Sequence, residues 1–323
     1  MSVDFSRVGL AVGHATDAER GTGCTVVRGI DGPRRGGVAV FGRATGSREL
    51  HALAPDALAD RVDAVFLTGG SAYGLDAAAG VMRWMEERHR GFAIGPGVVP
   101  IVPAAVIFDL APLGRFDGRP TPAMAYEACE TATPTEVREG SVGAGTGATV
   151  GKAAGLSRAM KGGVGCAERG SAGVWVAALA VVNAFGDVRD AAGRIIAGAR
   201  GDPGRFLDVS RLLVEAPHQL AAMAAEQRMH NTTLAVVATN AALDRVQLQQ
   251  LARAAGAALF HRITPAGSSY DGDMIFALGA LDGTGADALH VEALAVAALE
   301  EAIERGVRHA RGTPGLPGLA DAS

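Results

Sequence analysis

An α/β sandwich folded as a single domain is the fold class that this sequence predicts. Apolar β-prone runs alternate with segments of helical periodicity along the whole chain, and elements mixed in this way pack as layers. No internal repeat and no linker divides the 323 residues, which are enough to bury a large core. Hydrophobic residues make up 48% of the chain and charged residues 20%, as in ordinary globular proteins.

The expected strands are short runs rich in Val, Ile, Leu and Phe, bounded by polar residues or glycines. They span residues 62–68, 174–185, 232–240 and 274–278. The expected helices carry apolar residues at three- and four-residue spacing. They span residues 75–88, 210–229 (capped by Ser210), 241–259 (capped by Asn240) and 287–308. Residues 311–323 are rich in Pro and Gly, and we expect them to be disordered.

Charge and cysteine content argue against several classes of protein. The net charge of −4 gives no electrostatic reason to bind nucleic acid, and no apolar run has the length of a membrane helix. Cys24, Cys129 and Cys166 are widely spaced and lack CxxC pairing, which indicates a reducing compartment and no structural zinc. We therefore expect a cytoplasmic protein without metal or cofactor, with neither nucleic acid nor membrane as partner.

The 45 glycines are about twice the average share of roughly 7%. They cluster at 69–70, 95–97, 143–147 and 162–165, where the backbone turns or approaches another group closely. Such places often line an enzyme site, and tight turns of a large sandwich are an equally good interpretation. Two glycine motifs fail: residues 145–153 do not have the spacing of a phosphate-binding loop, and residues 69–74 miss the nucleophile-elbow pattern by one position.

Residues 231–240 place a threonine at the start of a strand, directly after Asn231. If the bond before Thr232 is cut, the freed α-amino group lies on the same residue as the hydroxyl. Such an amine has a reference pKa of about 7.7–8.0 and can accept the hydroxyl proton, so that the threonine becomes a nucleophile. The pattern alone also fits an ordinary Thr-rich strand.

Many blocks spread along the chain together resemble the L-aminopeptidase/D-esterase family, the DmpA-like group that includes β-peptidyl aminopeptidases. The similarity covers roughly residues 8–310. The blocks are at residues 12–14, 21–27, 67–76, 142–147, 161–165, 182–186, 231–233 and 271–277.

The resemblance implies a self-processing N-terminal-nucleophile hydrolase with a four-layer αββα sandwich. The cut between Asn231 and Thr232 leaves an α subunit, residues 1–231, and a β subunit, residues 232–323, which stay associated in one domain. Similar members form tetramers of αβ pairs, so we expect a homo-oligomer.

The resemblance also implies the catalytic residues. Thr232 is the nucleophile, and Asn183 matches an asparagine associated with the oxyanion; a buried, backbone-bonded Asn is the alternative. Asp271 and Asp273 lie where aminopeptidase members have Ser-Gly-Glu, and a simple turn at 270–273 is the alternative. The direction in which these carboxylates and burial shift the pKa of the Thr232 amine stays open.

Substrate contacts are expected at Gly145, Thr146, Gly147 and Asp109. Aminopeptidase members carry an acid and a phenol where this chain has Ala104 and Val106, so strict recognition of a free ammonium is doubtful. The predicted function is an amide hydrolase of small peptides or peptide-like amides that works through an acyl-threonine. An N-terminal-Thr acyltransferase, similar to ornithine acetyltransferases, and a non-processing binding protein remain alternatives.

Overall fold

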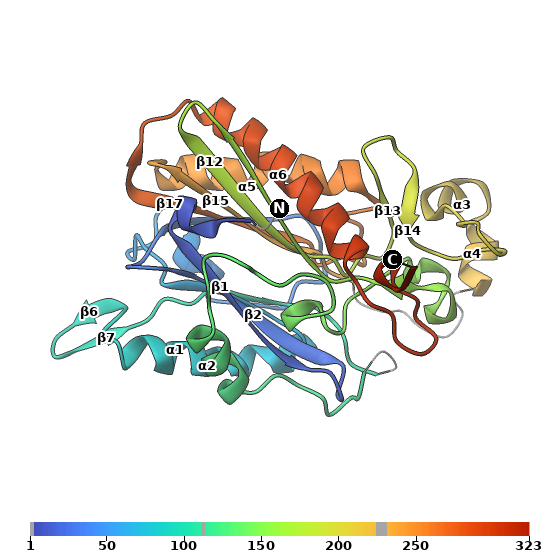
Figure 1. Cartoon of the computed structure of the whole chain (residues 1–323), viewed down its shortest axis with the longest axis horizontal. Coiled ribbons are helices and arrows are strands. Elements are labelled where there is room, and N and C mark those ends of the chain that lie inside the picture. The colour runs from blue at the N-terminus through green and yellow to red at the C-terminus, as the bar shows by residue number, and fades with distance from the viewer. Residues whose placement is uncertain (1–2, 112–113, 224–230, 323) are drawn as a thin grey trace.

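The computed structural model describes residues 3–111, 114–223 and 231–322, and its elements stack in four layers (Figure 1). Helices α5 (Arg245–Arg262) and α6 (Ala288–Arg308) form one outer layer, and α1 (Ala78–Glu86) and α2 (Pro122–Glu130) form the other. Two five-stranded sheets lie between them, face to face. The expected αββα sandwich is confirmed.

The first sheet lies against α1 and α2 and contains mostly N-terminal strands. Its strands are, in spatial order, β1 (Leu10–Asp17), β2 (Thr22–Gly29), β5 (Ala64–Thr68), β8 (Ala104–Val106) and β4 (Ser47–Arg48). Neighbours are antiparallel except β5 and β8, which run parallel.

The second sheet lies against α5 and α6 and joins distant parts of the chain. Its strands are, in spatial order, β11 (Val164–Ser171), β12 (Val174–Val181), β15 (Leu234–Ala241), β17 (Met274–Thr284) and β3 (Arg35–Val40). The central pair, β15 and β17, is parallel, and the other pairs are antiparallel. Parallel strands begin at the same end of a sheet, so the segments that enter β15 and β17 lie side by side.

Alternation along the strands fills the core on both faces of the second sheet. Val236 and Phe276 pack between the two sheets, whereas Val237 and Ala277 pack against the helices. A third cluster, which includes Phe66 and Val81, lies between the first sheet and α1–α2.

The remaining elements are short and lie in the connections. The strands are β6 (Phe92–Ile94), β7 (Gly97–Val99), β9 (Thr149–Val150), β10 (Met160–Lys161), β13 (Asp187–Arg189), β14 (Ile195–Ala197) and β16 (Ile263–Thr264). The helices are η1 (Phe5–Val8), η2 (Leu50–Leu53), η3 (Ser71–Ala77), η4 (Gly143–Gly145), η5 (Lys152–Ala154), η6 (Leu156–Arg158), α3 (Val209–Glu215), α4 (Pro217–Met223) and η7 (Leu319–Ala322).

Several helix boundaries differ from the expected ones for local reasons. The helix expected at 241–259 begins at Arg245, because Asp244 and Gln247 form a capping box there. The helix expected at 210–229 is instead the pair α3 and α4, since Pro217 supplies no backbone N–H to continue α3. The end of that expected helix, residues 224–230, lies outside the described residues.

The tail expected to be disordered has defined contacts over residues 311–322. The Asp321 carboxylate accepts hydrogen bonds from the N–H groups of Gly312 and Gly318, and the Lys161 N–H donates to the Pro317 carbonyl. Gly and Pro serve tight turns here, and Leu319 packs on the core. Among the described residues, no helix combines the length and apolar content needed to cross a membrane.

Candidate active site

The Asn231–Thr232 peptide bond lies where the segments entering β15 and β17 meet. Asn231 forms a parallel bridge with Asp271, and the Thr232 N–H donates to the Asn183 carbonyl at 3.0 Å. Thr232 is 4% exposed, and it precedes β15 by one residue, Thr233. The sequence-predicted residues Asn183, Asn231, Thr232, Asp271 and Asp273 are therefore brought together.

The Asn231 carbonyl oxygen accepts two hydrogen bonds. The Thr232 hydroxyl donates to it at 2.6 Å, and the Gly272 N–H donates at 2.7 Å. A hydroxyl lying against the carbonyl of its own preceding residue is next to the atom that it would attack. A backbone N–H aimed at the same oxygen is the kind of donor that stabilises an oxyanion. Gly272 was not singled out from the sequence, because its contribution is a backbone group.

The carboxylates of Asp271 and Asp273 hold the turn that enters β17. Asp273 accepts from the Thr233 N–H at 2.6 Å and from the Gly267 N–H at 2.9 Å, and Asp271 accepts from the Ser268 N–H at 2.8 Å. Both side chains are buried, which raises the pKa of each carboxyl above its usual range. The negative charge of Asp271 raises the pKa of Asp273 further.

Lys152 is a buried cation that the sequence reasoning missed. Its ammonium donates to Asn183 Oδ1 at 2.7 Å and to the Asn183 carbonyl at 3.2 Å. Burial lowers the pKa of Lys152 to about 7, although Asp271 and Asp273 oppose this shift. The available signal in the sequence is a single lysine inside the otherwise uncharged run 148–154.

Asn183 connects the lysine to the Asn231–Thr232 bond. Its Oδ1 accepts from Lys152 and, at 3.1 Å, from the Thr149 N–H, which fixes the orientation of the amide. Its Nδ2 is buried and has no partner among the described residues. This donor is therefore available to a substrate oxygen or to an ordered water.

A cavity of about 230 Å³ opens at Thr232. The described residues that line it are uncharged: Ala44, Thr45, Gly46, Ser71, Ala72, Val106, Phe108 and Thr232. Val106, one of the two positions flagged from the sequence, forms part of the wall. The other, Ala104, is fully buried in the core under α1 and α2.

The expected substrate contacts Gly145, Thr146, Gly147 and Asp109 are not among the residues lining this cavity. Asp109 is 1% exposed, and its carboxylate accepts from Thr22 Oγ1 at 2.7 Å and from the Gly70 N–H at 2.6 Å. A side chain on Gly147 would collide with Asp109, so this glycine makes room for the acid. The Thr146 carbonyl accepts a hydrogen bond from the buried ammonium of Lys161.

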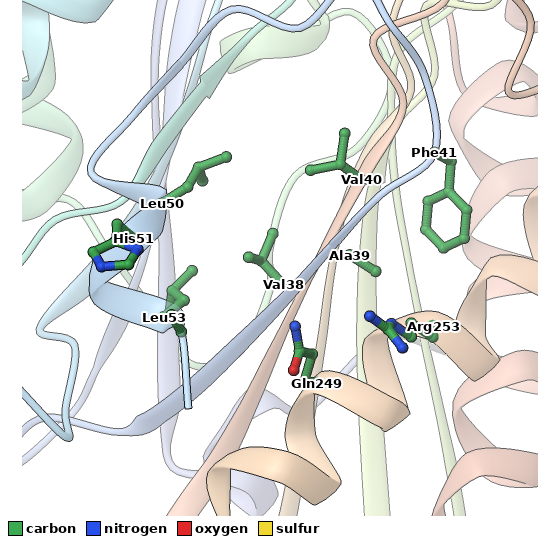
Figure 2. A pocket seen from close by; sticks show the side chains of 10 residues that line it. Val38, Ala39, Val40, Phe41, Leu50, His51, Leu53, Gln249 and Arg253 are labelled. Carbon is green, nitrogen blue, oxygen red and sulfur yellow. The ribbon is translucent and has the colours of Figure 1, made fainter. Parts of the chain in front are cut away.

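A larger cavity of about 600 Å³ lies at the free edge of β3, between η2 and α5 (Figure 2). Val38, Val40, Leu50 and Leu53 provide its apolar wall, and Gln249 and Arg253 approach from α5. None of the sequence-predicted site residues borders it. Within the described part of the chain, no group of three His, Cys, Asp or Glu side chains could hold a metal ion.

Comparison with known proteins identifies the family. The model of peptidase family S58 matches residues 7–320. A Mycobacterium tuberculosis protein named as an uncharacterized aminopeptidase is 43% identical over 90% of this chain and 84% of its own. The 6-aminohexanoate-oligomer endohydrolase of Paenarthrobacter ureafaciens is 31% identical over 85% of this chain and 74% of its own.

The fold is similar to that of a solved peptidase. The L-aminopeptidase D-Ala-esterase/amidase of Ochrobactrum anthropi, described as a variant of the Ntn hydrolase fold, superposes with a TM-score of 0.72. The two share 22% identity over 98% of this chain and 90% of the other. Because the family model spans almost every residue, this protein belongs to peptidase family S58 and is a hydrolase of peptide bonds.

Proposed function

We propose that this peptidase cleaves itself between Asn231 and Thr232 and then acts on peptide-like amides through an acyl-threonine. One observation carries the proposal: the Thr232 hydroxyl and the Gly272 N–H both lie on the Asn231 carbonyl oxygen, at 2.6 and 2.7 Å. An attacking group and an oxyanion donor on one carbonyl are the two elements that acyl transfer requires.

In the cleavage step, Thr232 Oγ1 adds to the Asn231 carbonyl carbon and loses its proton. The carbonyl oxygen becomes an oxyanion held by the Gly272 N–H. The C–N bond then breaks, the proton is transferred to the departing nitrogen, and an ester joins Asn231 to Thr232 Oγ1. Water hydrolyses this ester and leaves a free α-amine and a free hydroxyl on Thr232.

The two fragments remain paired after the cut, because β15 is a central strand. It pairs with β12, which belongs to residues 1–231. The pairing runs from Leu234 opposite Val181 to Thr239 opposite Val176. On the other side of the β subunit, β17 pairs with β3 of the larger fragment. Hydrogen-bonded neighbours on both sides hold residues 232–323 in the sheet.

During turnover the freed amine is the base. The Thr232 nitrogen lies 3.0 Å from the Asn183 carbonyl, which also accepts from Lys152, so the amine and the lysine share one acceptor. A positive charge on Lys152 disfavours protonation of the amine, whereas negative charges on Asp271 and Asp273 favour it. Asn183 Nδ2 supplies a donor for the substrate oxyanion.

The cavity supports an uncharged substrate group next to the scissile amide. Its described lining is apolar apart from hydroxyls, and a substrate ammonium there would be desolvated without a partner. The 31% identical relative is named as an endohydrolase of 6-aminohexanoate oligomers, in which amides are separated by methylene chains. We therefore propose internal amides of such peptide-like chains as substrates.

A pair of adjacent threonines tests the proposal. Thr232→Val keeps the shape of the side chain and removes the hydroxyl, so we expect a single chain of 323 residues on denaturing gels and no hydrolysis of 6-aminohexanoate oligomers. Thr233→Val is the matched control and should give fragments of 231 and 92 residues. The shorter fragment should begin with Thr-Val-Leu-Ala. Wild-type protein that hydrolyses oligomers as an intact chain would refute the mechanism.

A further inference from the structure

The wall of the cavity at Thr232 contains a residue in an unusual backbone conformation. Ser71 has φ of 52°, in the left-handed region that non-glycine residues seldom adopt. It lines the cavity together with Thr232, and its hydroxyl makes no hydrogen bond with any described residue. Strained residues of this kind are found at sites where the surrounding structure holds a side chain in place for a ligand.

The surrounding structure fixes Ser71 from both sides. Its own N–H donates to the Ile107 carbonyl at 3.0 Å, so the residue is tied to the end of the chain segment that follows β8. The preceding residue, Gly70, is itself left-handed, with φ of 82°, and its N–H donates to Asp109 Oδ1 at 2.6 Å. Asp109 in turn is held by Thr22 Oγ1.

Glycines make room for this arrangement. A Cβ on Gly69 would lie 2.0 Å from Asp109 Oδ2, and a Cβ on Gly147 would lie 2.3 Å from Asp109 Cβ. The buried acid therefore fits only because both neighbours lack side chains. At the cavity surface, Asp109 acts through the position of the Gly70–Ser71 turn.

We propose that Ser71 contacts the substrate, its hydroxyl hydrogen-bonding an amide group next to the bond that Thr232 attacks, and that Asp109 is the residue that positions it. This inference rests on the proposed function and names the substrate group that the cavity recognises. Asp109 touches Gly70 and Thr22 and is absent from the cavity lining, so it acts through the turn.

Two substrates of equal length test the contact. N-acetyl-6-aminohexanoic acid p-nitroanilide carries the neighbouring amide at the spacing of a 6-aminohexanoate oligomer, and nonanoic acid p-nitroanilide has methylenes in the same place. Wild-type enzyme should have the higher kcat/KM for the first substrate, because its amide bonds the Ser71 hydroxyl and the second substrate leaves that hydroxyl without a partner. In Ser71→Ala and Ser71→Gly this preference should fall about tenfold, the effect of one lost hydrogen bond.

Glycine separates the hydroxyl from the backbone strain. Ser71→Gly accepts the left-handed conformation, so its Tm should not fall, while its preference falls as in Ser71→Ala. Ala172→Gly, at another left-handed position in the exposed β11–β12 turn, is the matched control and should leave both Tm and preference unchanged. Self-cleavage should proceed normally in all of these variants, since Ser71 makes no contact with the Asn231 carbonyl.

Asp109 is tested by its amide and by a double variant. Asp109→Asn keeps an acceptor for the Gly70 N–H and should retain most of the preference, whereas Asp109→Ala should lose it. Adding Asp109→Ala to Ser71→Gly should cause no further loss, because both act through one contact. Processed enzyme whose preference is unchanged in Ser71→Gly overturns this inference alone; wild-type protein that stays a single chain overturns the proposed function as well.

Discussion

Replacing Gly272 by alanine tests whether the position of the Thr232 hydroxyl controls self-cleavage. A Cβ built on Gly272 lies 2.7 Å from Thr232 Oγ1 and 2.5 Å from the Ala44 carbonyl oxygen. Ordinary contact begins near 3.4 Å, so the hydroxyl must retreat by about 0.7 Å. A displacement of about 1 Å from the reactive geometry reduces a rate by roughly 10²-fold, and we expect a decrease of this order.

Cell-free translation followed by a time course on denaturing gels measures this rate directly. Gly285→Ala lies in the same fragment, where an added Cβ meets nothing within 4 Å, and it should process at the wild-type rate. The Tm of Gly272→Ala measured in the Thr232→Val background, which stays a single chain, shows whether the fold survives. If folded Gly272→Ala protein cleaves before Thr232 as fast as wild type, the hydroxyl does not need its observed position and the reasoning is wrong.

Two further predictions concern buried polar groups, and a third concerns the C-terminal tail. Asn183→Asp keeps the acceptor for Lys152 and Thr149 but removes the Nδ2 donor, so kcat for amide hydrolysis should fall about 10²- to 10³-fold at unchanged Tm; near-normal turnover would exclude Nδ2. Burial lowers the pKa of Lys152 from 10.5 to about 7, so the unfolded chain holds this proton when the folded one does not. Lys152 should therefore contribute about 2 kcal/mol to a rise in the free energy of unfolding of the Thr232→Val chain from pH 7 to pH 9, and adding Lys152→Met should make the rise measured in urea titrations smaller by this amount. Deleting residues 312–323 removes the Leu319 packing and the Pro317 acceptor of the Lys161 N–H, and should lower Tm by a few degrees without changing the cleavage site; an unchanged Tm would mean that the tail contributes nothing.

Hydrophobic periodicity predicted the three central strands of the second sheet and its covering helix, whereas the arrangement in four layers was implied by the family resemblance. The runs at 174–185, 232–240 and 274–278 became the central strands, and 287–308 became α6 with Asp287 as its N-cap. Capping details were less accessible, since Asn240 and Asp244 are both residue types that can begin a helix. Asn240 was expected to start α5, but the Asp244–Gln247 pair provides two reciprocal hydrogen bonds, and the helix begins there.

The family resemblance predicted side chains that the fold brings together at the Asn231–Thr232 bond, but not the backbone groups or the burial around that bond. Thr232, Asn183 and the two aspartates came from residue types in a matching order. Gly272 and Ser71 could not be found this way, because the hydrogen bond of the Gly272 N–H and the left-handed conformation that places Ser71 both depend on the tertiary structure. Lys152 was missed because a lysine is ordinarily exposed, and only the fold shows that it is 4% exposed.

Three buried ionisable side chains surround the Asn231–Thr232 bond, although burying a charge is unfavourable for stability. Lys152, Asp271 and Asp273 are all buried with pKa values shifted toward their neutral forms, which means that the folded state is less favourable for their charges than water is. Apolar residues of similar size would pack as well or better in a site that only needed to be stable. Under the proposed self-cleavage, the ammonium and the two carboxyls beside this peptide bond are proton carriers at the place where a proton moves from oxygen to nitrogen.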